Sequence, residues 1–222
     1  MRCLLLIIFF MLAMPQNAKA GPWLREKGTT FTSVSLTANY YLETASQTYL
    51  EYGLTEKMTL IANIGMARQH FLPESGYATF SLRRALSKPE AQSKWAYEFG
   101  VGVGWAGETR LPHVRTGISW GKGMTWGERS GWAVVEAEVV WDMTDQLHLA
   151  KLDGTVGMNF TDVTAGMLQI YTAHTALAST ASIAPSLIFS PKNSKFRLQI
   201  GAEADVVQFD KTALKIGLWR EF

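Results

Sequence analysis

The sequence predicts an all-β protein, a single antiparallel up-and-down β-barrel that crosses a membrane with about twelve strands. Three observations support this prediction. Long segments alternate between apolar residues and small, polar or charged ones, which is the period of a strand with two different faces. These segments recur about every 17 residues and are separated by clusters of turn-forming residues. After the first twenty residues, no stretch approaches the roughly 20 apolar residues that a membrane-spanning helix requires.

The alternation is clearest in residues 95–105. The apolar face of this predicted strand is formed by Trp95, Tyr97, Phe99, Val101, Val103 and Trp105. At about 3.3 Å per residue and a tilt near 45°, the two Trp side chains lie roughly 23 Å apart along a membrane normal. Transmembrane barrels have an apolar band about 25 Å tall between two aromatic girdles. We therefore expect Trp95, Trp105 and also Trp141, which ends a similar segment, to form a girdle facing lipid.

Twelve strands are expected, near residues 29–40, 46–54, 57–68, 76–86, 94–105, 113–121, 131–142, 147–160, 163–173, 179–189, 195–207 and 212–222. Segments 76–86 and 113–121 alternate least clearly, so ten or fourteen strands remain possible. Segments 57–68, 131–142 and 195–207 repeat the pattern, with one apolar face and one polar or charged face. The connections are short and polar, and none is long enough to form a plug domain.

The first twenty residues are predicted to be a secretory signal peptide. Arg2 gives a positive start, residues 4–14 form an apolar core, and residues 17–20 supply an A-x-A-like cleavage site. The domain organisation is therefore a cleaved signal peptide at 1–20 followed by one barrel domain at 21–222. An uncleaved membrane anchor is the alternative.

The composition of the processed chain argues against several kinds of partner. Its only cysteine, Cys3, lies in the signal peptide, so the mature chain has no thiol and no disulfide. Loss of Arg2 and Lys19 leaves 19 basic and 19 acidic residues. A net charge of zero argues against nucleic acid as a partner, because such binding depends on basic surface charge.

The polar faces of the predicted strands carry enough charge to line a lumen. The expected lumen-lining residues are Glu51, Arg83, Glu98, Arg115, Glu136, Glu138, Lys151, Asp153, Arg197, Glu203, Asp205 and Lys215. Such a mixed set of charges can control selectivity in a water-filled pore, so we expect a passive pore or transporter for small solutes. The alternative is a non-conducting structural barrel filled by an internal salt-bridge network, since twelve strands fall between filled eight-strand barrels and open porins.

The last strand resembles the C-terminal strand of Gram-negative outer-membrane β-barrels. Its apolar face carries Leu214, Ile216, Leu218 and the terminal Phe222. The resemblance implies an outer-membrane location, contact with outer-membrane lipid, and assembly by periplasmic chaperones and the barrel-assembly machinery. That machinery would read Leu218 and Phe222. Arg220 departs from the pattern, because a hydrophobic residue is usual there.

A second resemblance concerns residues 49–60, Tyr-Leu-Glu-Tyr-Gly-Leu-Thr followed by Met-Thr-Leu. This segment is similar to a hairpin of small uncharacterised barrels and of barrels described as aromatic-compound transporters. It implies the architecture only, and no substrate.

An enzyme is a lesser alternative. A hydrolase site on a barrel requires a serine with a basic partner, and His174 lies near Ser179 while His70 lies near Ser75. Neither arrangement matches a barrel-hydrolase motif, so we predict no lipid hydrolase, no catalytic residue and no cofactor. The histidines have no paired spacing and no cysteine partner, so no metal site is predicted. A soluble lipocalin-like periplasmic binder is the remaining alternative.

Overall fold

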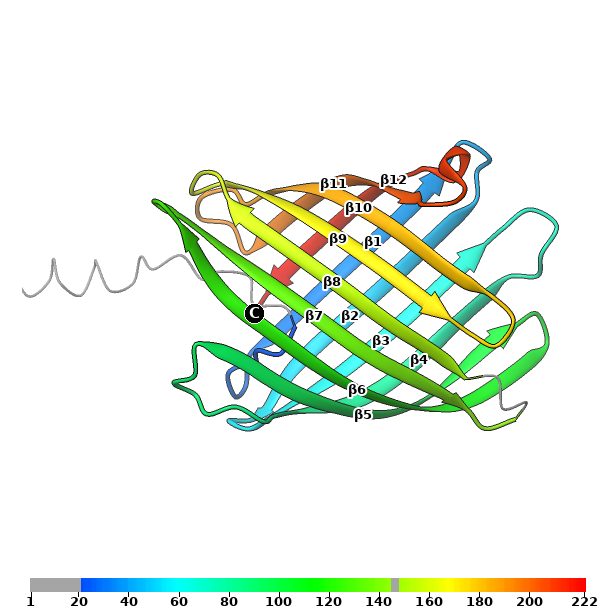
Figure 1. The fold of residues 1–222 in the computed structure, drawn as a ribbon, viewed down its shortest axis with the longest axis horizontal. Helices are drawn as coiled ribbons and strands as arrows, with labels where there is room; N and C mark the ends of the chain where they lie inside the picture. The colour runs from blue at the N-terminus through cyan, green and yellow to red at the C-terminus, as the bar shows by residue number, and fades with distance from the viewer. Residues whose placement is uncertain (1–20, 145–147) are drawn as a thin grey trace, which may run out of the picture.

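The computed structural model describes residues 21–144 and 148–222, which form one closed β-barrel (Figure 1). Its antiparallel strands follow one another in chain order: β1 (Thr30–Asn39), β2 (Thr44–Thr55), β3 (Met58–Arg68), β4 (Ser75–Ala85), β5 (Ser93–Ala106), β6 (Thr109–Trp126), β7 (Arg129–Asp142), β8 (Leu149–Asn159), β9 (Thr164–His174), β10 (Ser179–Phe189), β11 (Phe196–Asp205) and β12 (Ala213–Glu221). Residues 1–20, the predicted signal peptide, and residue 147, the predicted start of the eighth strand, lie outside the described residues.

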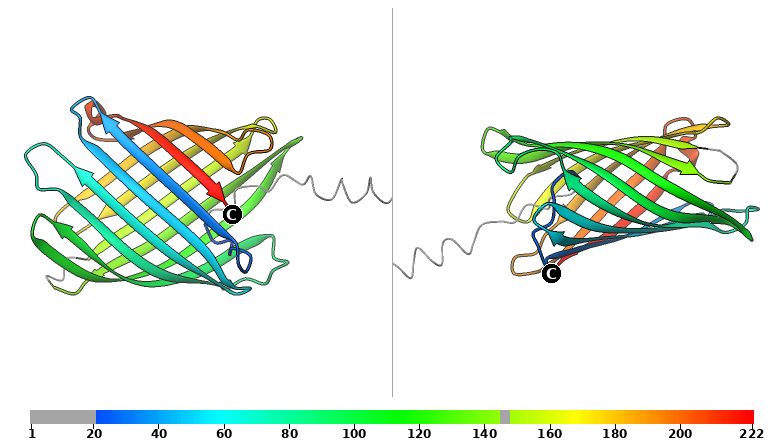
Figure 2. Two further views of the ribbon diagram at one scale, coloured as in Figure 1. Left: turned by 180° about the vertical axis from the view of Figure 1, so that it is seen from behind. Right: turned by 90° about the horizontal axis from the view of Figure 1, so that it is seen from below.

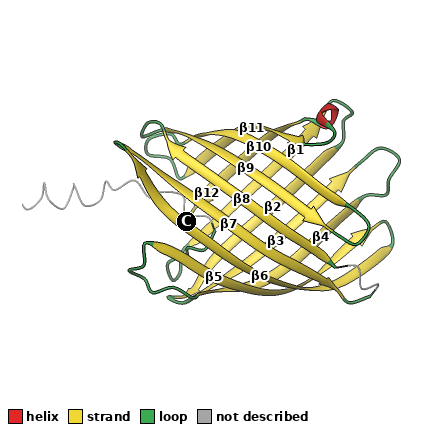
Figure 3. Ribbon diagram, in the orientation of Figure 1, coloured by secondary structure: helices red, strands yellow, loops and turns green. Residues whose placement is uncertain are grey.

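Pairing of β1 with β12 closes the barrel, so the described sheet has no free edge. The 3-10 helix η1 (Phe209–Lys211) precedes β12 and is a single turn (Figure 3). In the described part of the chain, no helix has the length and hydropathy needed to span a membrane.

All twelve predicted strands are present, which confirms the fold class and the strand count. Their ends agree with the sequence prediction within two residues, except in β6, which is longer than the predicted segment 113–121. Pro112 precedes the predicted segment, and glycines occur at its last residue, 121, and at 123; both residue types are common in turns. In the structure Trp105 pairs with Arg110, and β7 pairs along the other flank, so both neighbours continue the ladder.

The two faces of the barrel wall have opposite chemistry, and the apolar face is the outer one. On β4, Phe80 is 57% exposed, whereas Thr79, Ser81 and Arg83 are at most 3% exposed. A soluble barrel would bury its apolar side chains and expose its charges. The reverse arrangement is that of a barrel surrounded by lipid, with polar groups facing the lumen.

One part of the interior is apolar. Ala165, Met167 and Ile188 are buried together, and Trp132 and Trp219 pack against them. These residues lie on the inner faces of β7, β9, β10 and β12, near the turns that join β8 to β9 and β10 to β11. The cluster therefore fills part of the lumen at one end of the barrel.

We call that end the terminal end, because the described chain both starts and finishes there (Figure 2). The Phe222 amide donates a hydrogen bond to the Thr30 carbonyl at 2.9 Å, which ties the C-terminus to the start of β1. The opposite end, the loop end, carries the β1–β2 connection and the other odd-numbered connections. Residues 21–28, called here the N-terminal strap, precede β1 and turn into the lumen at the terminal end.

Candidate pore lining

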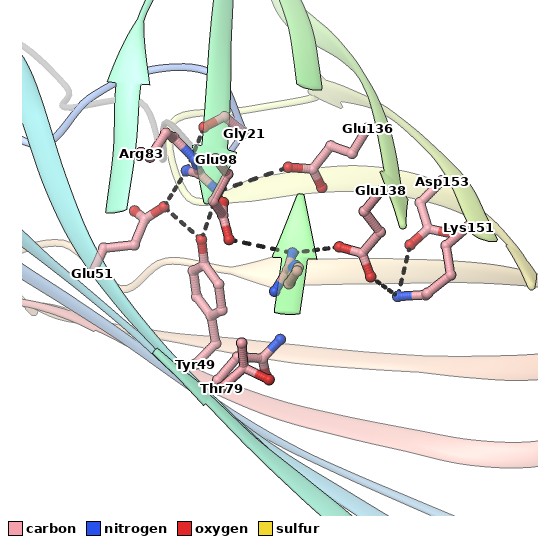
Figure 4. Close-up of polar contacts among 12 residues, drawn as sticks. Gly21, Tyr49, Glu51, Thr79, Arg83, Glu98, Glu136, Glu138, Lys151 and Asp153 are labelled. Carbon is pink, nitrogen blue, oxygen red and sulfur yellow. Dashed lines mark hydrogen bonds and ion pairs between the residues drawn. The ribbon is translucent and has the colours of Figure 1, made fainter. Parts of the chain in front are cut away.

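Eight of the twelve predicted lumen residues form one connected set of ion pairs on the inner wall. We call this set the charge ladder (Figure 4); its members are Glu51, Arg83, Glu98, Arg115, Glu136, Glu138, Lys151 and Asp153. The nitrogen–oxygen distances are 2.6 Å for Glu51–Arg83, 3.1 Å for Arg83–Glu98, 3.5 Å for Glu98–Arg115, 2.9 Å for Glu138–Lys151 and 3.4 Å for Lys151–Asp153. Arg115 and Glu138 are in direct contact between these pairs. The ladder thus runs across the inner faces of β2 and β4 to β8.

Arg83 is the junction of the charge ladder. Its Nη1 donates to Glu51 Oε1 and to the Gly21 carbonyl, both at 2.6 Å. Its Nη2 donates to the Tyr49 hydroxyl at 3.0 Å and to Glu98 Oε2 at 3.1 Å. Arg83 and Glu51 are almost fully buried, and buried charges are stable only when they are paired and hydrogen-bonded. The junction therefore fixes β2, β4 and β5 to the N-terminal strap.

Strand register brings the ladder partners together. Arg83 on β4 lies directly opposite Glu98 on β5, and Glu138 on β7 lies directly opposite Lys151 on β8. Gly100 lies opposite Arg115, on the same inner face. A Cβ at Gly100 would collide with Ser81 Oγ and lie 2.7 Å from the Phe80 carbonyl oxygen, so this position beside Arg115 has no room for a side chain.

The N-terminal strap is held by Arg25. The Arg25 backbone amide donates to Thr59 Oγ1 at 3.0 Å, and its Nε donates to Glu51 Oε2 at 2.5 Å. Its Nη1 lies 3.5 Å from Glu221 Oε1, and its guanidinium stacks 4.4 Å from the centre of the Phe31 ring. These partners come from β1, β2, β3 and β12, so the side chain and backbone amide of one residue join the strap to four strands.

Two glycines on the wall allow the strap to lie close. A Cβ at Gly53 would collide with the Glu26 carbonyl, and one at Gly121 would lie 2.7 Å from Pro22 and 2.8 Å from Trp23. The sequence prediction considered plugs only among the loops between strands. It therefore missed that the N-terminal strap enters the lumen, and Arg25 was not among the predicted lumen residues. Residues 21–28 carry no alternation that could have indicated this role.

The four remaining predicted lumen residues lie outside the charge ladder. Lys215 Nζ contacts Glu203 at 3.3 Å and the Tyr171 hydroxyl at 3.1 Å, and Arg197 lies 3.8 Å from Glu221. Asp205, at the end of β11, accepts hydrogen bonds from the amides of residues 207 and 208, so its carboxylate stabilises the following turn.

A polar cavity of about 350 Å³ lies in the lumen near the loop end. It is lined by Thr37, Lys151, Tyr171, Thr172, Ala173, Thr180, Ala181, Ser182, Glu203, Asp205, Lys211 and Ala213. Hydroxyl groups, amines and carboxylates therefore all line this cavity.

The three predicted girdle residues point outward. Trp95 and Trp105 lie on the outer face of β5, and the Trp105 indole covers the backbone of Gly76. Trp141 lies on the outer face of β7, where its Nε1 donates to Thr116 Oγ1 at 2.8 Å. Trp95 is near the terminal end, while Trp105 and Trp141 are near the loop end.

The exception in the C-terminal strand has a structural reason. Arg220 points outward with Leu218 and Phe222, and its guanidinium lies 4.0 Å from the Phe222 ring centre and 4.7 Å from that of Phe196. A cation between two aromatic faces is stabilised by both, and its long side chain extends along the apolar surface. The arginine is therefore accommodated without disturbing the aromatic end of the strand.

The histidines do not form an evident catalytic group. His174 Nδ1 and Ser179 Oγ are 2.6 Å apart at the rim of the loop end, but no carboxylate of the described residues contacts this histidine. His113 Nε2 contacts Thr79 Oγ1 at 3.0 Å inside the wall. Within residues 21–144 and 148–222, no group of three His, Cys, Asp or Glu side chains is arranged to hold a metal ion.

A closed antiparallel barrel with an apolar exterior and a charged lumen is the fold of outer-membrane β-barrel proteins. Solved structures agree with this class. The chain is similar to the KdgM porin, with a TM-score of 0.59 and 8% identity over 87% of this chain and 99% of the porin. It is also similar to the COG4313 outer membrane channel from Pseudomonas putida F1, with a TM-score of 0.52 and 12% identity over 95% of this chain and all of that one.

A second KdgM structure, in complex with disordered oligogalacturonate, gives a TM-score of 0.58 at 8% identity, over 87% of this chain and 99% of the porin. No family model matches this chain, and no curated protein sequence matches it. The likeness at these identities is therefore one of fold.

Proposed function

We propose that this protein is an outer-membrane pore for small polar solutes, narrowed at its terminal end by the N-terminal strap. The observation that carries the proposal is the uneven exposure of the charge ladder. Glu51 and Arg83 have side chains that are 1% and 3% exposed, whereas those of Glu136 and Lys151 are 43% and 32% exposed. A ladder that served only to fill the barrel would be buried along its whole length. In this barrel, the part of the charge ladder that contains Glu136 and Lys151 faces the open lumen.

The strap and the polar cavity give this pore two different ends. At the loop end, the cavity offers polar groups to an entering solute. At the terminal end, Arg25 and Arg83 hold the strap across the lumen, beside the apolar cluster of Trp132 and Trp219. The narrow part would discriminate by size, and the charge ladder by charge. The fold shared with the KdgM porin and the COG4313 channel supports this proposal.

The membrane position follows from the outer surface. We place Trp95 at one lipid interface and Trp105 and Trp141 at the other, with the apolar wall between them in hydrocarbon. Export would use a cleaved signal peptide at 1–20. Phe222 and Leu218, which are exposed at the end of the last strand, would be read by the barrel-assembly machinery.

Single-channel recording in planar lipid bilayers tests the pore. The wild-type protein should show small steps of current. Arg25→Gln should show larger steps, because it removes the pairs that anchor the strap to Glu51 and Glu221. The double variant Glu136→Gln/Glu138→Gln should shift the ion preference of the pore towards anions, because it removes two carboxylates from the lumen.

Glu108→Gln is the matched control, because Glu108 is exposed in the turn between β5 and β6 and lies outside the lumen. It should leave both step size and ion preference unchanged. Absence of current at every voltage, in the wild type and in Arg25→Gln alike, would refute the pore. It would favour the second candidate, a non-conducting structural barrel, for which the near-complete burial of the Glu51–Arg83 pair is the specific support.

A further inference from the structure

The first described residue, Gly21, lies inside the lumen against charged groups. Its carbonyl accepts a hydrogen bond from Arg83 Nη1 at 2.6 Å, and the residue is buried. A Cβ at this position would lie 2.7 Å from Val134 Cγ1, so Gly21 touches the inner face of β7. Glu136 is two residues further along the same face. Figure 4 shows Gly21, Arg83, Glu98 and Glu136 around one part of the lumen.

Glu136 is the carboxylate with the weakest pairing in this region. Among the described residues, its one charged partner is Arg83 Nη2, at 3.9 Å. Glu51 and Glu138 each contact two cations, and Glu98 contacts Arg83 at 3.1 Å and Arg115 at 3.5 Å. The carboxylate of Glu136 can therefore accept an ion pair with a second cation.

The charges of the connected network do not balance. Ion pairs extend the charge ladder through Arg25 to Glu221 and on to Arg197. The connected acids are Glu51, Glu98, Glu136, Glu138, Asp153 and Glu221. The connected bases are Arg25, Arg83, Arg115, Lys151 and Arg197. Among the ion pairs of residues 21–144 and 148–222 named above, six carboxylates thus face five cations, and an uncompensated charge is unfavourable where the surroundings are partly shielded from water.

Removal of the predicted signal peptide would create the missing cation at this position. Hydrolysis of the bond between residues 20 and 21 adds water across it. The departing peptide keeps a carboxylate, and Gly21 gains an amine. That amine takes up a proton at neutral pH, because an α-amino group has a pKa of about 7.7–8.0. The processed chain then carries an ammonium group on Gly21, the same residue whose carbonyl accepts a hydrogen bond from Arg83.

We propose that Glu136 binds the α-ammonium group of Gly21 in the processed chain, and that this ion pair balances the charges of the connected network. The inference rests on the predicted cleavage site and not on conduction. Cleavage would then do more than release the chain for export, because it would supply the group that fastens the tip of the strap to β7. A glycine suits this position, since any side chain would press against Val134.

The test is a titration of the α-amine. The chain starting at Gly21 is refolded in detergent, its amines are reductively methylated with 13C, and the α-amine signal is followed by NMR against pH. The charged and titratable groups around it are Arg83, Glu51, Tyr49, Glu98 and Glu136. An opposite charge within about 4–6 Å raises the pKa of a cation by about one unit or more. Glu136→Gln should therefore lower the pKa of the α-amine by about one unit.

Glu138→Gln is the matched control, because Glu138 is on the same strand face but is paired with Arg115 and Lys151. It should lower the pKa of the α-amine less than Glu136→Gln does. Equal pKa values in the wild type and in Glu136→Gln would overturn the proposal.

A second measurement does not depend on the folding of a variant. Acetylation of the α-amine removes its charge, so the acetylated wild-type chain should unfold at a lower temperature than the free chain. An unchanged midpoint would overturn the proposal. So would mass spectrometry showing that the chain purified from membranes begins at a residue other than Gly21. None of these measurements uses conductance. A result that refutes the Gly21–Glu136 ion pair therefore leaves the proposed pore untouched, and the reverse also holds.

Discussion

The substitution Arg83→Met removes the cation at the junction of the charge ladder and leaves a shorter, unbranched apolar side chain. It leaves Glu51 and Glu98 buried, with 0% and 8% exposure. Removing one partner of a buried ion pair costs about 3–5 kcal/mol, because the remaining charge is uncompensated. Glu51 keeps Arg25 at 2.5 Å, and Glu98 keeps Arg115 at 3.5 Å. We therefore expect a loss of about 3 kcal/mol in the free energy of unfolding, the lower end of that range.

Equilibrium unfolding in urea, in detergent micelles at pH 7, measures this loss. Tryptophan fluorescence and heat-dependent gel migration serve as two independent probes of a cooperative transition. Arg129→Met is the control, because Arg129 is exposed at the start of β7, and its midpoint should match that of the wild type. Adding Glu98→Gln to Arg83→Met should recover part of the loss, since it removes a stranded carboxylate. A wild-type midpoint for Arg83→Met would refute the argument that burial makes this junction stabilising.

Three further outcomes are expected. Gly53→Ala should increase single-channel conductance, because the added Cβ would displace the backbone of the strap. Gly123→Ala should leave the conductance unchanged, because the space around Gly123 is open. Equal conductance of Gly53→Ala and the wild type would contradict the proposed constriction. The contribution of Trp95 to the fluorescence is the difference between the wild type and Trp95→Phe. Lipids brominated near the headgroup should quench this contribution more than lipids brominated at the bilayer centre, and the opposite order would contradict an interfacial position. Phe222→Ala should lower the amount of folded barrel in cell membranes while refolding in detergent proceeds normally, and undiminished assembly in cells would show that Phe222 is not read.

Strands and faces could be predicted from the sequence because a membrane barrel imposes a period of two along its whole wall. In β5, every second residue from Trp95 to Trp105 faces outward, and the pattern alone determines this. The partners within the lumen could not be predicted in the same way, because they depend on register. Glu136 lies directly opposite Asp153, a repulsive pair that the ladder compensates with Arg83 and Lys151.

The N-terminal strap was not predictable for a different reason. Its contacts join residues far apart in the chain, such as Arg25 with Glu51 and Gly21 with Arg83, and they need no local periodicity. The extra length of β6 was missed because Pro112 is typical of turns, yet it is tolerated here at a position where β5 continues to pair.

The position of Arg25 has a consequence for the order of folding. Its partners include Phe31 on β1, Glu51 on β2 and Glu221 on β12, so they come from both ends of the chain. They lie within reach of one side chain only after the first and last strands have paired. Arg25 can therefore complete its contacts only in a finished barrel. A fully docked strap therefore marks a chain whose first and last strands have paired.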